Sequence, residues 1–405
     1  MKTVHAAVAR HVEDIQAILV EFVQVEAASA IALLAVTALA LVIANSPLGH
    51  GYEAALAAKL GPAWLRLSTL HWINDGFMAV FFLLVGLEIK REVVVGALSR
   101  VRQATLPLVA AIGGLILPAV IYVAINAGNA AALAGWATPV ATDIAFALGV
   151  LALLGSRVPA SIKVFLTALA VLDDLFVVAI IAVFYATDVS IHYLLLAALG
   201  LMVLIGFNLL GLVRVWAYLI VGALVWFCFM RSGVHPTLAG VLVALTVPAR
   251  GRAPNTDASP LHRLEHGLHP WIAWLVIPVF AFANAGVSFG GVTWAVAGGS
   301  IPVGIVLALF LGKQFGILGA VWLAIRSGLA DLPEGANFRH MHGVAVVCGV
   351  GFTMSLFIGS LAFADATMET AVKIGVLAAS LLSGIVGYVL LRMACPSKPG
   401  GTSGA

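Results

Sequence analysis

Charged residues are scarce in this chain of 405 residues: Asp, Glu, Lys and Arg make up 10% of it, against a usual ~25%. Apolar residues reach 62%, which is more than a soluble fold can hold inside, because its surface must be largely polar. The net charge of +3 is too small for a nucleic-acid footprint, so no nucleic-acid partner is expected. The composition predicts an integral membrane protein whose partner is the lipid bilayer.

Cysteine is also rare, and its placement excludes two kinds of small scaffold. The three cysteines show no CxxC spacing and no cluster with histidine; they are Cys228, Cys348 and Cys395. Neither a disulfide framework nor a zinc site is therefore expected, and we predict no cofactor.

Three regions are predicted along the chain. Residues 1–26 mix charges with apolar residues and have no signal-peptide pattern, which indicates a cytoplasmic amphipathic segment. Residues 27–393 contain long apolar segments with short linkers and are predicted to form a single transmembrane domain. Residues 394–405 are rich in Gly, Pro and Ser, and we predict a disordered cytoplasmic tail.

Twelve segments have the length and apolar character of transmembrane helices, which predicts an all-α membrane protein. They lie near residues 27–45, 72–89, 105–125, 134–154, 161–185, 191–211, 214–229, 235–248, 268–286, 301–325, 342–364 and 370–393. An even number of spans leaves both termini on one side. Sixteen basic residues fall on that side and four on the other, so the positive-inside rule predicts that both termini are cytoplasmic.

Four charged residues remain inside predicted spans: Asp143, Asp173, Asp174 and Lys313. Each such charge costs about 2.5–3.5 kcal/mol on insertion scales. A structural ion pair would account for one lysine and one aspartate. It leaves two carboxylates that are expected to take up a proton or bind a cation. Asp173 and Asp174 point about 100° apart on a helix, so one can face Lys313 while the other faces a cavity.

Two predicted spans carry helix-breaking residues in the middle. Span 4 contains Pro139 shortly before Thr142 and Asp143, and span 11 contains Gly349 and Gly351. Glycine in a membrane helix is also a common packing residue. However, each interrupted span is the second of a three-span group (3–5 and 10–12), a pattern typical of inverted-repeat transporters with broken helices.

Broken helices place helix ends, and their partial charges, inside the membrane. Asp143 is expected to offset the positive N-terminal ends, and Lys313 the negative C-terminal ends. Thr353 follows the glycines of span 11 and can satisfy backbone groups that the break frees.

Several longer motifs resemble those of NhaA-type Na+/H+ antiporters, in the order found in that family. They are residues 72–76 (WINDG), 79–92 (AVFFLLVGLEIKRE), 141–156 (ATDIAFALGVLALLGS), 172–175 (LDDL), 232–240 (SGVHPTLAG), 263–270 (RLEHGLHP), 280–287 (FAFANAGV), 312–313 (GK) and 348–355 (CGVGFTMS). The resemblance covers most of the chain, from about residue 44 to residue 392.

The resemblance implies twelve transmembrane helices in which helices 4 and 11 are broken and cross at mid-membrane. It implies electrogenic exchange of cytoplasmic Na+ or Li+ for about two external protons in a bacterial inner membrane, by alternating access. Asp174 would bind the cation, and Asp173 would pair with Lys313 and take part as it titrates. Thr142 and Asp143 would be the broken-helix residues beside the site.

The resemblance also implies a region that responds to pH at the cytoplasmic ends of two spans. Its residues here are Glu88, Arg263, Glu265, His266 and His269. An ordinary charged collar at the membrane surface would have the same composition. Histidine titrates near ~6.5, which suits a pH response, although alkaline activation also requires coupling to the acidic residues.

Asp75 allows two interpretations. At the outer end of span 2 it would line the outer funnel, or it would cap that helix. His235, beside Pro236, is expected to start a helix rather than to bind an ion.

Four features depart from the family pattern. Phe176 follows the LDDL motif where a small residue is usual, Gln314 follows Lys313 where proline is common, and His262 precedes Arg263 in place of a basic residue. The family's dimer contact is a hairpin between spans 1 and 2, so a homodimer is implied. The segment 48–70 has little strand-like alternation before Trp64, so the sequence leaves dimerisation through this hairpin open.

Two rival functions fit less well. Intramembrane aspartyl proteases carry YD and GxGD elements, whereas Thr142 precedes Asp143 and Leu172 precedes Asp173 here, so an enzyme is not expected. A passive cation channel would not need the titratable set of aspartates and lysine. Exchange of Na+ for H+ remains the prediction.

Overall fold

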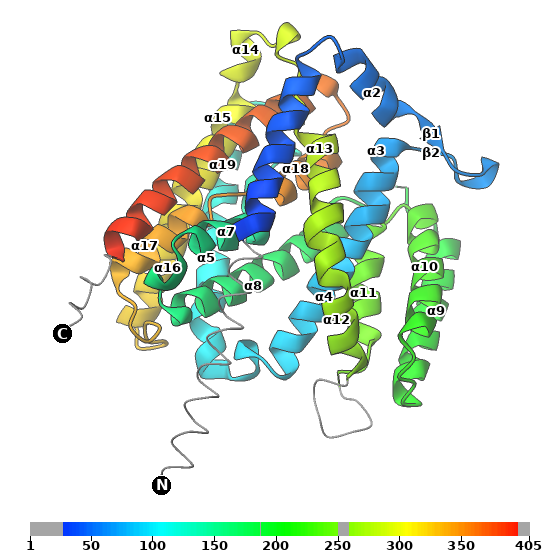
Figure 1. Cartoon of the computed structure of the whole chain (residues 1–405), viewed down its shortest axis with the longest axis horizontal. Helices are drawn as coiled ribbons and strands as arrows, with labels where there is room; N and C mark the ends of the chain where they lie inside the picture. Colours follow the sequence, from blue (N-terminus) through cyan, green and yellow to red (C-terminus); the bar gives the residue numbers. More distant parts are fainter. Residues whose placement is uncertain (1–26, 187, 250–258, 396–405) are drawn as a thin grey trace, which may run out of the picture.

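The computed structural model describes residues 27–186, 188–249 and 259–395 and folds almost entirely into helices (Figure 1). The predicted amphipathic segment 1–26 and nearly all of the predicted tail 394–405 lie outside the described residues. Their predictions are therefore untested.

Helices of several lengths follow one another along the chain. The α-helices are Ala27–Ala44, α2 Gly49–Ala57, α3 Thr69–His71, α4 Met78–Val94, α5 Val101–Asn126, α6 Ala130–Leu133, α7 Ile144–Leu153, α8 Ala160–Phe184, α9 Ile191–Leu209, α10 Val215–Ser232, α11 Thr237–Thr246, α12 Pro260–Trp271, α13 Ile277–Ala285, α14 Trp294–Ala297, α15 Ser300–Leu307, α16 Lys313–Arg326, α17 Phe338–Val347, α18 Phe352–Ala362 and α19 Ala366–Ala394. The 3-10 helices are η1 Ala63–Leu65, η3 Ala97–Ser99, η4 Thr138–Val140, η5 Gly155–Arg157 and η8 Phe289–Gly291. Wider π-helical turns are η2 Trp72–Phe77, η7 Ile272–Val276 and η9 Ala308–Gly312.

Among the described residues, eight helices are long and apolar enough to cross a membrane. The pair α17 and α18 forms a ninth candidate, bent by 44° at its break. Shorter apolar helices cover 138–153 and 237–246, and α3, η2 and α4 run without interruption over 69–94. The prediction of a helical multi-span membrane protein is confirmed, and each of the twelve predicted segments contains helix.

Helix α8 runs through the interior of the bundle. In its most apolar 18-residue window 72% of the residues are buried, against 11–39% in the other seven membrane-length helices. The outer helices instead expose large apolar side chains, among them Leu209 of α9 and Leu224 of α10, which suit a lipid environment. The polar residues of α8 therefore lie among protein rather than lipid.

Glycines set the spacing of the helices around α8. A Cβ on Gly113 of α5 would overlap the carbonyl oxygen of Gly316 of α16, and a Cβ on Gly316 would overlap that of Gly113. The two backbones therefore approach as closely as glycine allows. This contact fixes α16, whose first residue is Lys313, against the core.

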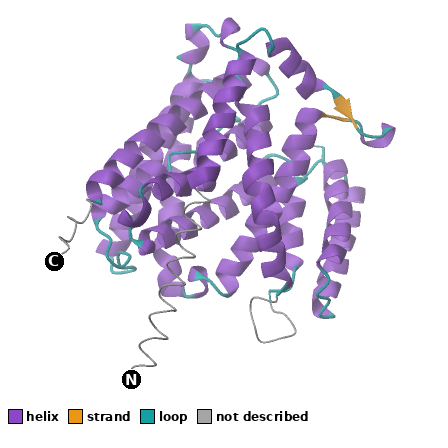
Figure 2. Ribbon diagram, viewed as in Figure 1, coloured by secondary structure: helices purple, strands orange, loops and turns teal. Residues whose placement is uncertain are grey.

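Segment 48–70 does contain a hairpin, although its sequence has little strand-like alternation before Trp64. Strands β1 Lys59–Leu60 and β2 Leu67–Ser68 pair antiparallel (Figure 2). Gly61 follows β1 with φ +107°, a backbone conformation that side-chain-bearing residues rarely adopt. Strands of two residues cannot display an alternating pattern, which is why the sequence did not reveal them.

Candidate functional site

Lys313 and Asp173 form an ion pair in the middle of the protein. Lys313 Nζ lies 2.5 Å from Asp173 Oδ2, and neither side chain has any exposed surface. The predicted pairing is thus present in the structure. Lys313 begins α16 immediately after the π-helical turn η9, and such turns often occur at functional sites.

Asp174 follows on α8 and is 2% exposed. Its Oδ1 has no hydrogen-bond partner among the described residues. Four charged side chains act on it electrostatically: Asp173, Glu88, Asp143 and Lys313. Its surroundings therefore hold three other carboxylates but one lysine. A carboxylate in such a place requires a proton or a cation.

The two interrupted spans meet at Asp143, which is the N-cap of α7. Its Oδ1 accepts a hydrogen bond from the backbone N–H of Phe146 at 3.0 Å. Its Oδ2 accepts from the backbone N–H of Thr353 at 3.0 Å and from the Thr353 hydroxyl at 2.5 Å. One carboxylate therefore holds the N-terminal ends of both α7 and α18, as was predicted from its charge.

Backbone groups at the breaks also bond across the crossing. The hydroxyl of Thr142 donates to the carbonyl oxygen of Cys348 at 2.9 Å, and the N–H of Asp143 donates to the carbonyl of Val350 at 2.7 Å. Each break leaves backbone groups without partners in their own helix. Here the other interrupted segment of the same chain supplies hydrogen-bond partners for some of them.

The predicted helix breakers lie at the two breaks. Pro139 sits in η4, two residues before the extended stretch that leads into α7. Gly349 and Gly351 lie between α17 and α18. A Cβ on Gly349 would lie 2.6 Å from the carbonyl oxygen of Leu309, so glycine is required where the break passes η9.

The acidic and basic residues at the ends of α4 and α12 come together only in part. Arg91 Nε lies 2.9 Å from Glu265 Oε1 and its Nη2 lies 3.2 Å from Glu92 Oε1. Arg263 instead donates to the carbonyl oxygen of Val213 at 2.8 Å. The region thus joins two spans through Arg91 and Glu265.

The remaining residues of this region lie along the same helices. The rings of His262 and His266 meet edge to face with centroids 4.1 Å apart, and Glu265 acts electrostatically on His269. Glu88 is close enough to act on Asp174. This electrostatic contact relates α4 to the buried carboxylates.

Asp75 does not cap a helix, so that interpretation is wrong. It lies inside η2, within an unbroken helical stretch, and makes no capping bond there. Its Oδ1 lies 3.6 Å from His235 Nε2, and its backbone carbonyl accepts from Trp226 Nε1 at 3.0 Å. His235 precedes α11 and bonds to the hydroxyl of Thr237, as expected for a residue at a helix start.

The sequence departures have distinct surroundings. Phe176 packs with the apolar cluster that includes Leu166 and Ile317. Gln314 Nε2 lies 2.6 Å from His342 Nε2 and so joins α16 to α17 next to Lys313.

A pair of hydrogen-bonded amides, one buried (Asn284) and one partly exposed (Asn74), was missed from the sequence. Asn284 of α13 donates to Asn74 Oδ1 at 2.8 Å and to its own helix at Phe280, and Asn74 donates back to Asn284 Oδ1 at 3.3 Å. Each asparagine lies in a largely apolar segment. A polar amide at such a position is the sequence feature that could have predicted the pair.

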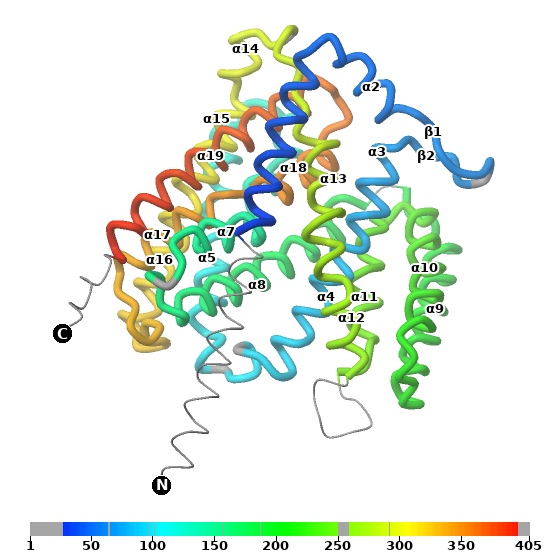
Figure 3. The backbone as a smooth tube through the Cα atoms, in the orientation of Figure 1, coloured from blue at the N-terminus to red at the C-terminus, as the bar shows by residue number. Residues whose placement is uncertain are grey.

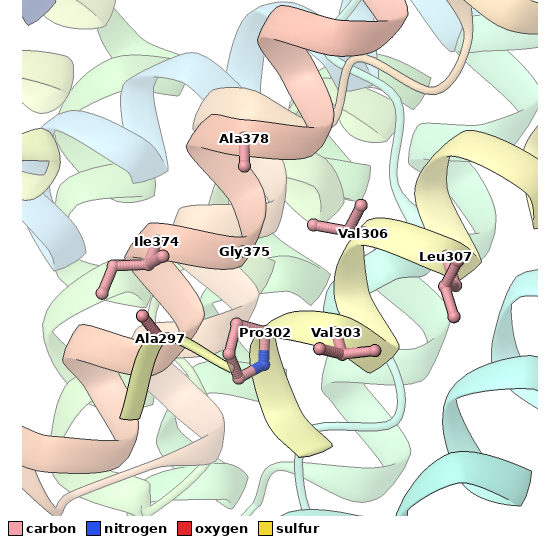
Figure 4. Close-up of a pocket in the computed structure, with 8 residues that line it drawn as sticks. All are labelled: Ala297, Pro302, Val303, Val306, Leu307, Ile374, Gly375 and Ala378. Carbon is pink, nitrogen blue, oxygen red and sulfur yellow. The ribbon is translucent and has the colours of Figure 1, made fainter. Parts of the chain in front are cut away.

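A cavity of about 190 Å³ between α15 and α19 is not the ion site. Figure 4 shows its lining, which consists of apolar residues: Ala297, Pro302, Val303, Val306, Leu307, Ile374, Gly375 and Ala378. None of these can coordinate a cation through its side chain, so the buried carboxylates of α8 remain the candidate.

Buried carboxylates beside one lysine, at the crossing of two broken helices in a multi-span protein, define a secondary transporter rather than an enzyme. A sequence profile described as Na+/H+ antiporter 1 matches residues 20–391. The chain therefore belongs to this antiporter family.

Close relatives cover nearly the whole chain. A protein named Na(+)/H(+) antiporter NhaA from Rhodospirillum rubrum is 54% identical over 387 residues, covering 93% of this chain and 97% of its own. Proteins of the same name from Bordetella parapertussis (55% over 383 residues, 93% and 96%) and Brucella ovis (53% over 382 residues, 94% and 96%) are similarly close.

Proposed function

We propose that this protein exchanges Na+, or Li+, for H+ across a bacterial cytoplasmic membrane, and that Asp174 binds the cation. The observation that carries the proposal is the fully buried Lys313–Asp173 pair with Asp174 beside it, one of whose oxygens has no hydrogen-bond partner. Carboxylate, hydroxyl and carbonyl oxygens are natural ligands of a hard cation. Membership of the antiporter family supports the same exchange.

Competition between protons and sodium explains the coupling. Sodium entering from the cytoplasm displaces protons from the buried site around Asp174, and protons from outside displace sodium. With neither ligand, bare carboxylates would be buried, which is costly, so the empty site should rarely change access. Two protons exchanged for one sodium ion move one net positive charge per cycle, which makes the exchange electrogenic.

The crossing at Asp143 supports alternating access. Asp143, Thr142 and Thr353 tie the two broken helices into one unit, and we infer that this unit rocks against the other helices around the site. The inference requires twelve spans, with spans 3–5 and 10–12 as inverted repeats.

The arrangement of loops supports cytoplasmic termini. The β-hairpin and α14 lie at one end of the molecule, and the loops after α4 and α9 lie at the other (Figure 3). The second end carries basic residues such as Arg100 and Arg214. By the positive-inside rule this end faces the cytoplasm.

Two further properties belong to the proposal. The contact of Arg91 with Glu265, and the effect of Glu88 on Asp174, offer a route by which cytoplasmic pH acts on the ion site. Arg263, His266 and His269 lie on the same helix as Glu265. The β1–β2 hairpin offers an edge for pairing with a second copy of the chain, which supports a homodimer.

Reconstitution of the full-length protein into liposomes tests the proposal. An imposed Na+ gradient is expected to change lumenal pH, with a rate that depends on the membrane potential. Asp174→Asn should abolish this exchange. Asp331→Asn is the matched control, because Asp331 is exposed and pairs only with exposed Arg102 at 3.0 Å. Exchange at the wild-type rate in Asp174→Asn would refute the site, and Na+ flux without proton movement would favour a channel.

A further inference from the structure

Helix α19 packs antiparallel against the broken pair α17 and α18 through small residues. A Cβ on Gly387 would lie 3.0 Å from the backbone nitrogen of Val347, and a Cβ on Gly349 would lie 2.5 Å from the hydroxyl oxygen of Ser383. As residue numbers rise along the broken pair, they fall along α19. This register brings Ser380 of α19 to the level of the break.

Ser380 provides a hydrogen-bond acceptor that the break itself lacks. The first N–H groups of a helix have no partner within that helix, and a side chain at the N-cap usually accepts from one of them. The N-cap of α18 is Gly351, which has no side chain to do this. The backbone N–H of Phe352 instead donates to Ser380 Oγ at 3.1 Å, and Ser380 is 4% exposed.

The next N–H of α18 leads directly to the ion site. Thr353 donates to Asp143 through both its backbone N–H and its hydroxyl. Two consecutive backbone N–H groups of α18 therefore donate to acceptors outside this helix, the first to Ser380 of α19 and the second to Asp143. Without the bond to Ser380, Asp143 would be the remaining side-chain acceptor, among the described residues, for these first N–H groups of α18.

We propose that Ser380 is a positioning residue for cation exchange: by capping α18 from a neighbouring helix, it keeps Thr353 within bonding reach of Asp143 beside the buried carboxylates. Ser380 acts through α18 and does not itself touch the ion. This inference rests on the proposed role of the crossing at Asp143.

The chain contains a close control for this role. Ser383 lies one helical turn further along α19 and is fully buried, but its Oγ has no hydrogen-bond partner among the described residues. Ser380→Ala and Ser383→Ala thus each remove a hydroxyl at a buried position of the same helix, and only the first leaves a backbone N–H without its acceptor.

The test measures exchange kinetics of the full-length variants in liposomes. Ser380→Ala is expected to raise the apparent KM for Na+ about five- to tenfold, the effect of losing one buried hydrogen bond. Ser383→Ala should stay within about twofold of wild type on the same reasoning. Ser380→Thr, which keeps the hydroxyl, should restore most of the affinity.

A role in folding alone would give a different result. It would lower the thermal unfolding midpoint of Ser380→Ala without changing KM, and that result, or equal KM values for the two alanine variants, would overturn the proposal. If Ser380→Ala does not accumulate, Ser380→Cys keeps a weak acceptor and should give an intermediate KM; a wild-type KM there would count against the proposal. Asp174→Asn tests the ion site separately, so the two ideas can fail independently.

Discussion

Replacing Lys313 by alanine removes the cationic half of an ion pair whose two side chains are fully buried. Loss of one partner of such a pair destabilises a protein by about 3–5 kcal/mol, because the remaining charge has no compensation. We expect Lys313→Ala to lose up to this amount of unfolding free energy while Asp173 stays ionised.

Thermal unfolding of the detergent-solubilised full-length protein measures this loss. Lys313→Ala/Asp173→Asn, which removes both charges, should recover most of the midpoint. Lys373→Ala is the control, because Lys373 pairs with Glu369 at 2.8 Å at a partly exposed position where such pairs contribute about 1 kcal/mol or less. Equal midpoints for Lys313→Ala and wild type, or a double variant less stable than the single one, would refute the reasoning.

Two further predictions address the break and the cytoplasmic contact. Gly349→Ala should prevent accumulation of folded protein, because its Cβ would lie 2.6 Å from a backbone carbonyl of η9; Gly319→Ala, with nothing within 4 Å, should fold normally, and similar yields in a size-exclusion assay would contradict this. Arg91→Ala should shift the pH at which exchange is half-maximal while leaving the maximal rate within about twofold, because its pair with Glu265 is partly exposed and weak. An unshifted pH profile would remove Arg91 from the pH response.

The scarcity of charge made the centre of the site predictable. In a chain this apolar, a lysine and three aspartates within predicted spans have few partners available, and the structure pairs Lys313 with Asp173 at 2.5 Å. Helix breakers likewise indicated where the spans are interrupted. Pro139 and Gly349 lie at the two breaks, and the matching places of the two spans in their three-span groups favoured breaks over packing glycines.

Features that depend on tertiary contacts were not predictable. The bond from Phe352 to Ser380 joins positions 28 residues apart, and a serine in an apolar helix looks like an ordinary packing residue. Asp75 approaches His235 from within a π-helical turn, and no local sequence pattern predicts that turn. The β1–β2 hairpin is too short for its strands to show periodicity.

The three buried aspartates, alike in sequence, have different bonding in the structure, and this divides their roles. Both oxygens of Asp143 accept hydrogen bonds from the ends of two half-helices, so its charge is used to hold the crossing. Asp173 forms an ion pair with Lys313 through Oδ2, while its Oδ1 has no hydrogen-bond partner among the described residues. Among the described residues Asp174 has no ion pair, and its Oδ1 has no hydrogen-bond partner, so it is the carboxylate most in need of a cation. The ion should therefore bind at Asp174 first and recruit Asp173 only as Lys313 is released.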